Sequence, residues 1–235
     1  LVKLLIQQLG EALDLAHRAG VVHRDLKPGN LFITHDWQRR PVLKVVDFGI
    51  AKLLENQARH TATQIGTPAY AAPEQLGVTF AMLAKREGLE IVQTITPATD
   101  VWPLGLIAFE MLTGAGPGHM WGVSTASELP LRVVLMPAER ASLRAGERAH
   151  LLPQGFDDWC ARCLERDARR RWPSAGEACS RLTQLLDGSA LEIGTGTIRR
   201  SADAFVPPPQ LEPARVLSSP QAPPTGQIAH SAATG

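Results

Sequence analysis

A short charged segment near the start of the chain constrains its fold more than any other feature. His23-Arg24-Asp25-Leu26-Lys27-Pro28-Gly29-Asn30 brings a carboxylate, an ammonium and an amide together in one run. Residues 1–18 before it carry apolar side chains at helical spacing, and Gly20 is a stop signal for that helix. The apolar runs 31–33 and 42–46 after it favour two short strands joined by a polar turn. The segment is therefore predicted to be a loop held between a packed helix and a small hairpin.

A second acidic loop follows the predicted hairpin. In Asp47-Phe48-Gly49 the carboxylate lies where the chain leaves a rigid element, and the glycine permits a sharp turn. Two separate carboxylates with a lysine and an asparagine suit phosphoryl transfer, in which one carboxylate accepts the acceptor's proton and the other holds Mg²⁺ on the phosphates. Either loop alone is weak evidence, but the pair favours a phosphotransferase.

The composition is that of a folded protein without a polyanionic partner. Of 235 residues, 44% are hydrophobic and 20% are charged, and the formal net charge of +1 presents no strong field to nucleic acid or to an anionic membrane. The longest apolar run, 101–109, is far shorter than the ~20 residues of a membrane span. We therefore expect neither a nucleic-acid partner nor a membrane span in this chain. Polar residues within 1–16 argue against a secretory signal, and the start at Leu1 is interpreted as a cut inside a longer protein.

The three cysteines, Cys160, Cys163 and Cys179, favour a reducing compartment. An odd number without a paired framework argues against a disulfide-stapled secreted domain, so we expect a cytoplasmic location. Cys160 and Cys163 have the spacing of half a zinc site, but no second Cys or His pair follows at ligand spacing. Two small residues on the core face of a helix is the favoured interpretation.

The texture of the sequence changes near residue 187. Helical periodicity recurs three times after the hairpin, at 101–113, 156–166 and 174–186. Ser174 and Glu177 form a capping box at the start of the last of these helices. The remaining sequence is rich in Gly, Ser, Thr, Ala and Pro, a composition that cannot bury enough apolar surface to order itself. We therefore assign 1–187 to one folded domain and 188–235 to a flexible, partly polyproline tail.

The two loops together resemble those of the eukaryotic-type (Hanks-type) protein kinases, and the match continues along the chain in the family's order. Three later segments resemble the end of the activation segment, the buried central helix of the large lobe and the motif that closes that lobe: 66–74, 100–114 and 163–175. The resemblance covers 1–187. It implies the large C-terminal lobe of a protein-kinase-like fold, mainly α-helical, with a short β-hairpin carrying the active-site loops. An excess of Arg over Lys and abundant Ala hint at a GC-rich bacterial genome.

The resemblance assigns roles to the residues of both loops. Asp25 would orient the substrate hydroxyl and accept its proton, and Lys27 would neutralise charge on the γ-phosphate of ATP. Asn30 and Asp47 would bind Mg²⁺ or Mn²⁺. Lys27 at its place after the catalytic Asp, and Thr67 in the segment that would contact both, are typical of serine/threonine kinases. The expected activity is transfer of the γ-phosphate to Ser or Thr hydroxyls of protein substrates.

The resemblance also suggests regulation and packing roles. Arg24 beside the catalytic Asp suggests a loop controlled by phosphorylation, with Thr61 and Thr63 as the candidate acceptors. The alternative is that both threonines are ordinary solvated loop residues. His23 and Phe48 are interpreted as packing residues rather than reacting groups.

Three further residues match structural positions of the family. Asp100 would accept backbone N–H groups of the catalytic loop, and it is placed at a helix start with Pro103 in the first turn. Glu74 and Arg171 match a pair that forms a buried ion pair. In the run 169–171, we expect Arg171 alone to turn inward from a solvated surface of mixed charge.

Departures from the family pattern leave alternatives open. The sequence has no Gly-rich phosphate loop, no strand Lys for the α and β phosphates and no partner Glu, so the small N-terminal lobe is absent from this chain. We therefore expect the fragment alone to be inactive and the missing lobe to be a required partner. Residues 78–96 make the chain roughly a dozen residues longer here than the family needs, and we expect a surface elaboration. The alternatives are a pseudokinase or binding module without turnover, and a small-molecule phosphotransferase of kinase-like fold.

Overall fold

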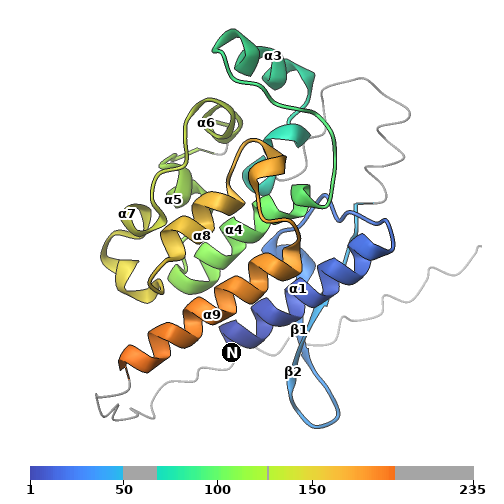
Figure 1. The fold of residues 1–235 in the computed structure, drawn as a ribbon, viewed down its shortest axis with the longest axis vertical. Helices are drawn as coiled ribbons and strands as arrows, with labels where there is room; N and C mark the ends of the chain where they lie inside the picture. The colour runs from blue at the N-terminus through green and yellow to red at the C-terminus, as the bar shows by residue number, and fades with distance from the viewer. Residues whose placement is uncertain (50–67, 126, 194–235) are drawn as a thin grey trace, which may run out of the picture. The chain divides into compact units, whose positions relative to one another are not determined.

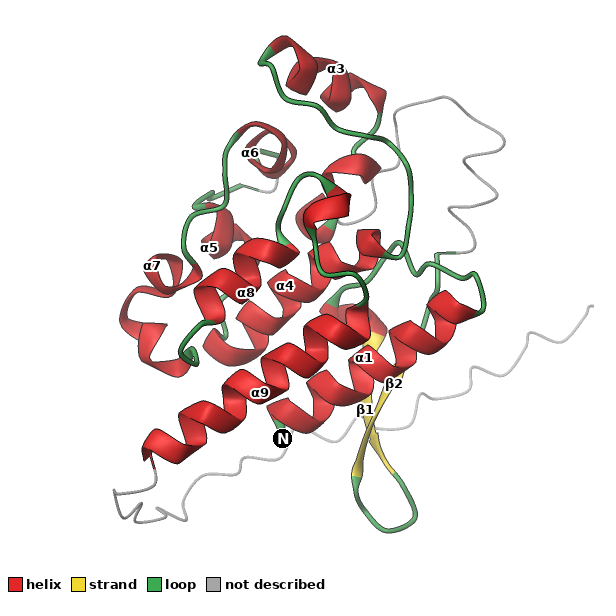
Figure 2. Ribbon diagram, viewed as in Figure 1, coloured by secondary structure: helices red, strands yellow, loops and turns green. Residues whose placement is uncertain are grey.

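The computed structural model describes residues 1–49, 68–125 and 127–193, and these are mainly helical (Figure 2). The long helices are α1 (Val2–Arg18), α4 (Ala98–Thr113) and α9 (Ala175–Ile193). Shorter helices are α3 (Val78–Arg86), α5 (Pro117–Trp121), α6 (Leu129–Leu135), α7 (Ala141–Ala145) and α8 (Phe156–Cys163). Strands β1 (Leu31–His35) and β2 (Pro41–Val45) pair antiparallel. The prediction of a mainly helical domain with one small hairpin is confirmed for the described residues.

Helix α4 forms the centre of the core. It is apolar on all sides, and every residue from Thr99 to Phe109 is buried, as expected for a helix surrounded by others. Helices α1, α5, α8 and α9 all contact it, and α1 and α9 lie side by side (Figure 1). The buried stripe of α1 is Leu5, Ile6, Leu9 and Leu13, which is the predicted apolar periodicity.

The cysteines pack where helices approach most closely. A Cβ on Gly10 of α1 would lie 2.6 Å from the Cβ of Cys179, and one on Gly105 of α4 would lie 2.7 Å from the Cβ of Cys163. All three cysteines are buried and free, and burial raises the pKa of the Cys160 thiol to about 12. The core interpretation is therefore confirmed over the zinc half-site.

Two helix ends differ from the prediction. The Thr99 hydroxyl accepts the Thr96 N–H at 3.1 Å, and α4 begins at Ala98, which leaves Pro103 inside the helix rather than in its first turn. Interior proline costs about 3 kcal/mol in an exposed helix, so the packing around this buried helix offsets that cost. Helix α8 ends at Cys163 instead of continuing to 166.

Helix α9 begins as predicted but continues further. The Ser174 hydroxyl accepts the Glu177 N–H at 3.1 Å, and the Asp14 carboxylate accepts the Gly176 N–H at 2.8 Å, so two side chains satisfy the first turn. The helix runs to Ile193, past the predicted start of the tail at 188. Gly188 does not stop it, because the following Ala, Leu and Glu are strong helix formers. The rest of the predicted tail, 194–235, lies outside the described residues.

The insertion at 78–96 carries a helix of its own. Helix α3 packs against α6 (Figure 1), with Ala84 fully buried and Val78 and Met82 exposed. Among the described residues no helix is both long and apolar enough to cross a bilayer.

Candidate functional site

The hairpin brings the two acidic loops together. In its register Leu31 pairs with Val45, so the loop that ends at Asn30 and the loop that contains Asp47 meet at the same end of the hairpin. The Val46 N–H donates to the Asn30 carbonyl at 3.0 Å, and the Gly49 N–H donates to the His23 carbonyl at 2.8 Å. The two loops therefore form one hydrogen-bonded unit.

Three predicted residues converge within the first loop. The Lys27 ammonium donates to the Asp25 carboxylate at 2.8 Å. The Asn30 side-chain amide donates to the Asp25 carbonyl at 2.8 Å and to its carboxylate at 3.4 Å. The side chains of Lys27 and Asp25 are 27% and 20% exposed, so a substrate could reach both, whereas Asn30 is buried.

The backbone of both loops is held in an unfavourable conformation. Arg24 and Asp47 have φ values of +64° and +54°, in the left-handed region that side chains other than glycine rarely adopt. Such residues cost about 1–3 kcal/mol each and cluster at functional sites. The Asp100 carboxylate secures the first loop, since it accepts the His23 N–H at 2.8 Å and the Arg24 N–H at 2.9 Å.

Two supporting residues were missed by the sequence analysis. His17, at the end of α1, hydrogen bonds through Nε2 to the Asp100 carboxylate at 2.7 Å, and both side chains are almost fully buried. Gln75 donates to the Arg24 carbonyl at 2.6 Å. A signal for His17 was available, because it lies four residues after Leu13 and so continues the buried stripe of α1.

His23 packs rather than reacts. Its Nδ1 accepts the Asp25 N–H at 3.3 Å, so the proton lies on Nε2, which donates to the Val46 carbonyl at 3.0 Å. The ring is fully buried, and its centroid lies 4.6 Å from that of Phe48. This is the packing role expected for the two residues.

Glu74 and Arg171 form a bidentate ion pair. Both guanidinium Nη atoms donate to the Glu74 carboxylate at 2.8 Å, and the two side chains are 0–1% exposed. Arg171 also donates to the carbonyls of Ala98 and Glu165. Of the three consecutive arginines it alone turns inward, since the Arg169 side chain is 78% exposed.

The residues present fit a hard cation such as Mg²⁺. The Asn30 amide nitrogen is engaged with Asp25, which leaves its side-chain oxygen for a cation, and Asp47 supplies an exposed carboxylate. No group of three or more His, Cys, Asp or Glu in 1–49, 68–125 and 127–193 could hold a metal on its own. Two protein oxygens with the rest supplied by phosphates and water is the usual arrangement for Mg²⁺. Thr61, Thr63 and Thr67 lie outside the described residues.

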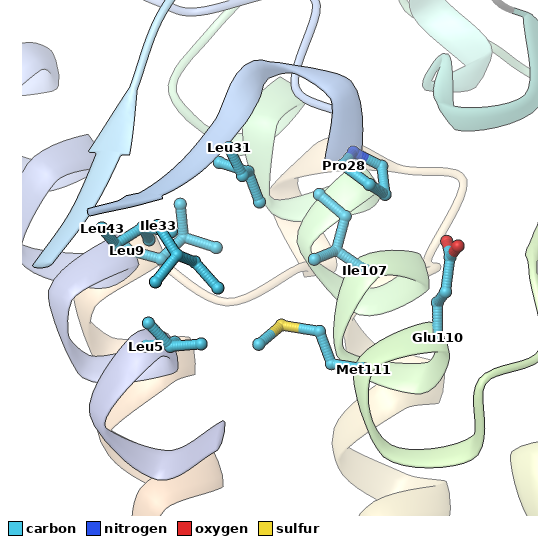
Figure 3. A pocket seen from close by; sticks show the side chains of 9 residues that line it. All are labelled: Leu5, Leu9, Pro28, Leu31, Ile33, Leu43, Ile107, Glu110 and Met111. Carbon is cyan, nitrogen blue, oxygen red and sulfur yellow. The ribbon is translucent and has the colours of Figure 1, made fainter. Parts of the chain in front are cut away.

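A cavity of about 270 Å³ adjoins the first loop but cannot be the phosphate site (Figure 3). Its walls come from α1, the hairpin and α4, and nearly all are aliphatic: Leu5, Leu9, Pro28, Leu31, Ile33, Leu43, Ile107 and Met111. Glu110 is the one ionisable lining residue, and its carboxylate accepts the Tyr70 hydroxyl. Burial and the Glu110 carboxylate raise the pKa of Tyr70, so this hydroxyl stays protonated and remains a donor. An apolar wall with one carboxylate repels phosphate.

The chain has many relatives among curated proteins. The protein kinase domain family matches residues 1–182. The probable serine/threonine-protein kinase PknB of Bifidobacterium longum is 28% identical over 230 residues, which cover 92% of this chain and 30% of that protein. The serine/threonine-protein kinase pkn2 of Myxococcus xanthus is 33% identical over 212 residues, covering 87% of this chain and 22% of that protein. The chain thus spans less than a third of the length of these relatives.

Solved structures share the fold. The crystal structure of Rad53 1-466 in complex with AMP-PNP aligns with a TM-score of 0.52 at 23% identity, covering 76% of this chain and 38% of that one. The PknI kinase domain of Mycobacterium tuberculosis aligns with a TM-score of 0.49 at 22% identity, covering 79% of this chain and 54% of that one. At 23% identity the likeness to Rad53 shows the fold alone.

Proposed function

The chain belongs to the protein kinase domain family, which matches residues 1–182, and from this premise we propose that it transfers the γ-phosphate of ATP to Ser or Thr hydroxyls of proteins. The observation that carries the proposal is the cluster of Asp25, Lys27 and Asn30, hydrogen bonded together and tied through the backbone to the loop of Asp47. Lys27 in this cluster, and relatives named serine/threonine kinases, support the class of acceptor.

Each residue would perform a separate part of the transfer. Asp25 would accept a hydrogen bond from the substrate hydroxyl and take its proton as the phosphate moves. Lys27, 2.8 Å from that carboxylate, would stabilise charge on the γ-phosphate. Asn30 and Asp47 would hold Mg²⁺ or Mn²⁺, which when bound neutralises the phosphates and aligns them. Asp100 would position the loop through the N–H groups of His23 and Arg24.

Arg24 would couple activity to phosphorylation. Its Nε–H is buried and has no partner among the described residues, and a guanidinium is a strong receptor for phosphate. A phosphate on Thr61 or Thr63 would supply the missing acceptor and so order the segment that contains Thr67.

The proposed active unit needs a second lobe. Residues 1–187 would form the large lobe, with α9 continuing to Ile193, and a polypeptide carrying a Gly-rich loop and a strand lysine would complete the nucleotide site. A cytoplasmic location is proposed on the three buried free thiols. A pseudokinase is disfavoured because all four reacting groups are retained, and a small-molecule phosphotransferase because 66–74 resemble a protein kinase activation segment.

The chain alone is expected to bind Mg·ATP very weakly. It lacks the groups that cradle the α and β phosphates, so most of the positioning contacts are missing. Isothermal titration calorimetry with the 235-residue chain should give a dissociation constant above about 1 mM. Micromolar affinity that Asp47→Asn abolishes would contradict the need for a second lobe.

Phosphoamino-acid analysis tests the class of acceptor. We would join the small lobe of a bacterial serine/threonine kinase ahead of Leu1 and supply radiolabelled ATP with a generic basic protein. The expected products are phosphoserine and phosphothreonine. Phosphotyrosine would overturn the acceptor class, and a chimera that binds ATP without transferring phosphate would support the pseudokinase alternative.

A further inference from the structure

A second, polar cavity lies between α5, α6 and α7, and none of the residues assigned to phosphoryl transfer lines it. Its volume is about 70 Å³, roughly that of two water molecules at about 30 Å³ each. Its polar lining comes from Trp121, Arg132, Glu139 and Arg144. We propose that this cavity binds a phosphate group, and the proposal does not depend on the kinase function.

Two lining residues present buried N–H groups that lack acceptors. Trp121 is 3% exposed, and its indole Nε1–H has no hydrogen-bond partner among the described residues. The Nε–H of Arg144 is likewise buried and unpartnered within that part of the chain. An unsatisfied buried donor costs about 1–3 kcal/mol, so two donors lining one cavity call for an acceptor inside it.

The charge of the lining selects an anion over water. Arg132 and Arg144 contribute two positive charges, and Glu139 contributes one negative charge. The Glu139 carboxylate is already engaged by Arg144 Nη2 at 2.7 Å, which leaves the arginine excess uncompensated. A water molecule would need acceptors for its own protons, and Glu139 is the one strong acceptor among the lining side chains. A phosphate oxygen, in contrast, accepts from every donor present.

Arg144 is held in place before a ligand arrives. A Cβ on Gly122 would lie 2.1 Å from Arg144 Nη1, so the guanidinium rests directly against the backbone of a glycine. Gly122 has a φ of +59°, which glycine adopts without strain. The ion pair with Glu139 fixes the other side. Because the fork is preorganised, binding loses little side-chain entropy.

The indole resonances of the intact chain provide a direct test. The sequence has five tryptophans, and Trp121→Phe identifies the Trp121 indole signal in a ¹⁵N–¹H spectrum. Titration with inorganic phosphate, at ionic strength held constant with chloride, should shift this signal saturably. The signals of Trp159 and Trp172 should stay in place, since their N–H groups donate to the carbonyls of Ala178 and Trp159.

Matched charge variants separate the cavity from general attraction. Arg144→Gln should weaken phosphate binding by about 10- to 100-fold, as expected for one lost charge-assisted hydrogen bond, and Arg132→Gln provides a second variant should the first unfold. Arg181→Gln removes the same charge from the exposed face of α9 and should leave binding unchanged.

Phosphoserine distinguishes a phosphorylated side chain from free phosphate. A saturable shift of the Trp121 signal with either compound supports a phosphate site and names its source. The proposal is overturned if neither compound moves that signal at tens of millimolar, if chloride moves it equally, or if Arg181→Gln weakens binding as much as Arg144→Gln.

Discussion

Replacing Arg171 with alanine is expected to destabilise the domain by about 3–5 kcal/mol, because it leaves the Glu74 carboxylate buried without its partner. Both side chains are essentially inaccessible to water, and Arg171 links Glu74 to the carbonyls of Ala98 and Glu165. One guanidinium therefore ties the end of the activation segment to the start of α4 and to the loop after α8. Equilibrium unfolding in urea measures the loss.

The neighbouring Arg169 provides the control. Its side chain is 78% exposed and pairs with the accessible Asp167, so Arg169→Ala should move the urea midpoint very little. Equal losses from the two substitutions would show that the buried pair contributes nothing beyond a surface ion pair.

The elements that the sequence predicted correctly are those with a strong local signal. The apolar stripe of α1, the two β-favouring runs and the capping box of α9 each depend on neighbours within a few residues. The errors arose where distant contacts override local rules. Pro103 reads as a first-turn proline but lies inside α4, because that helix is buried on all sides. Gly188 reads as a helix end, yet α9 continues to Ile193.

The site was predictable in its residue types and not in its supports. The order of Asp25, Lys27, Asn30 and Asp47 identified the family resemblance before any coordinates. His17 was missed because its partner Asp100 is 83 residues further along the chain, and no local pattern connects the two. The phosphate cavity was missed for the same reason, since Trp121, Arg132 and Arg144 belong to three different helices or their ends. In a balanced sequence these arginines read as ordinary surface charge.

Substitution of Asp25 by asparagine should slow phosphoryl transfer by about 10² to 10⁴, as expected for loss of a positioned proton acceptor. Asparagine keeps the shape of the side chain and an oxygen for Lys27, so the loop should keep its geometry. In the chimera with a supplied small lobe, Asp25→Asn should therefore bind Mg·ATP normally while transfer falls. Radiolabel transfer and calorimetry on the same preparation measure the two effects.

Asp47→Asn should instead reduce binding and transfer together. Asparagine tolerates the left-handed backbone at φ +54° but removes the charge that would hold the cation, and metal ligation underlies both nucleotide binding and phosphate alignment. Because Asp47 is exposed, the urea midpoint should be unchanged. Asp158→Asn, an exposed carboxylate on α8, should alter neither binding nor transfer. The role assignment fails if Asp25→Asn loses ATP binding as fully as Asp47→Asn, because one carboxylate would then serve the metal and neither would be a dedicated base. It fails equally if Asp25→Asn transfers phosphate at the unsubstituted rate, since proton acceptance would then lie with another group.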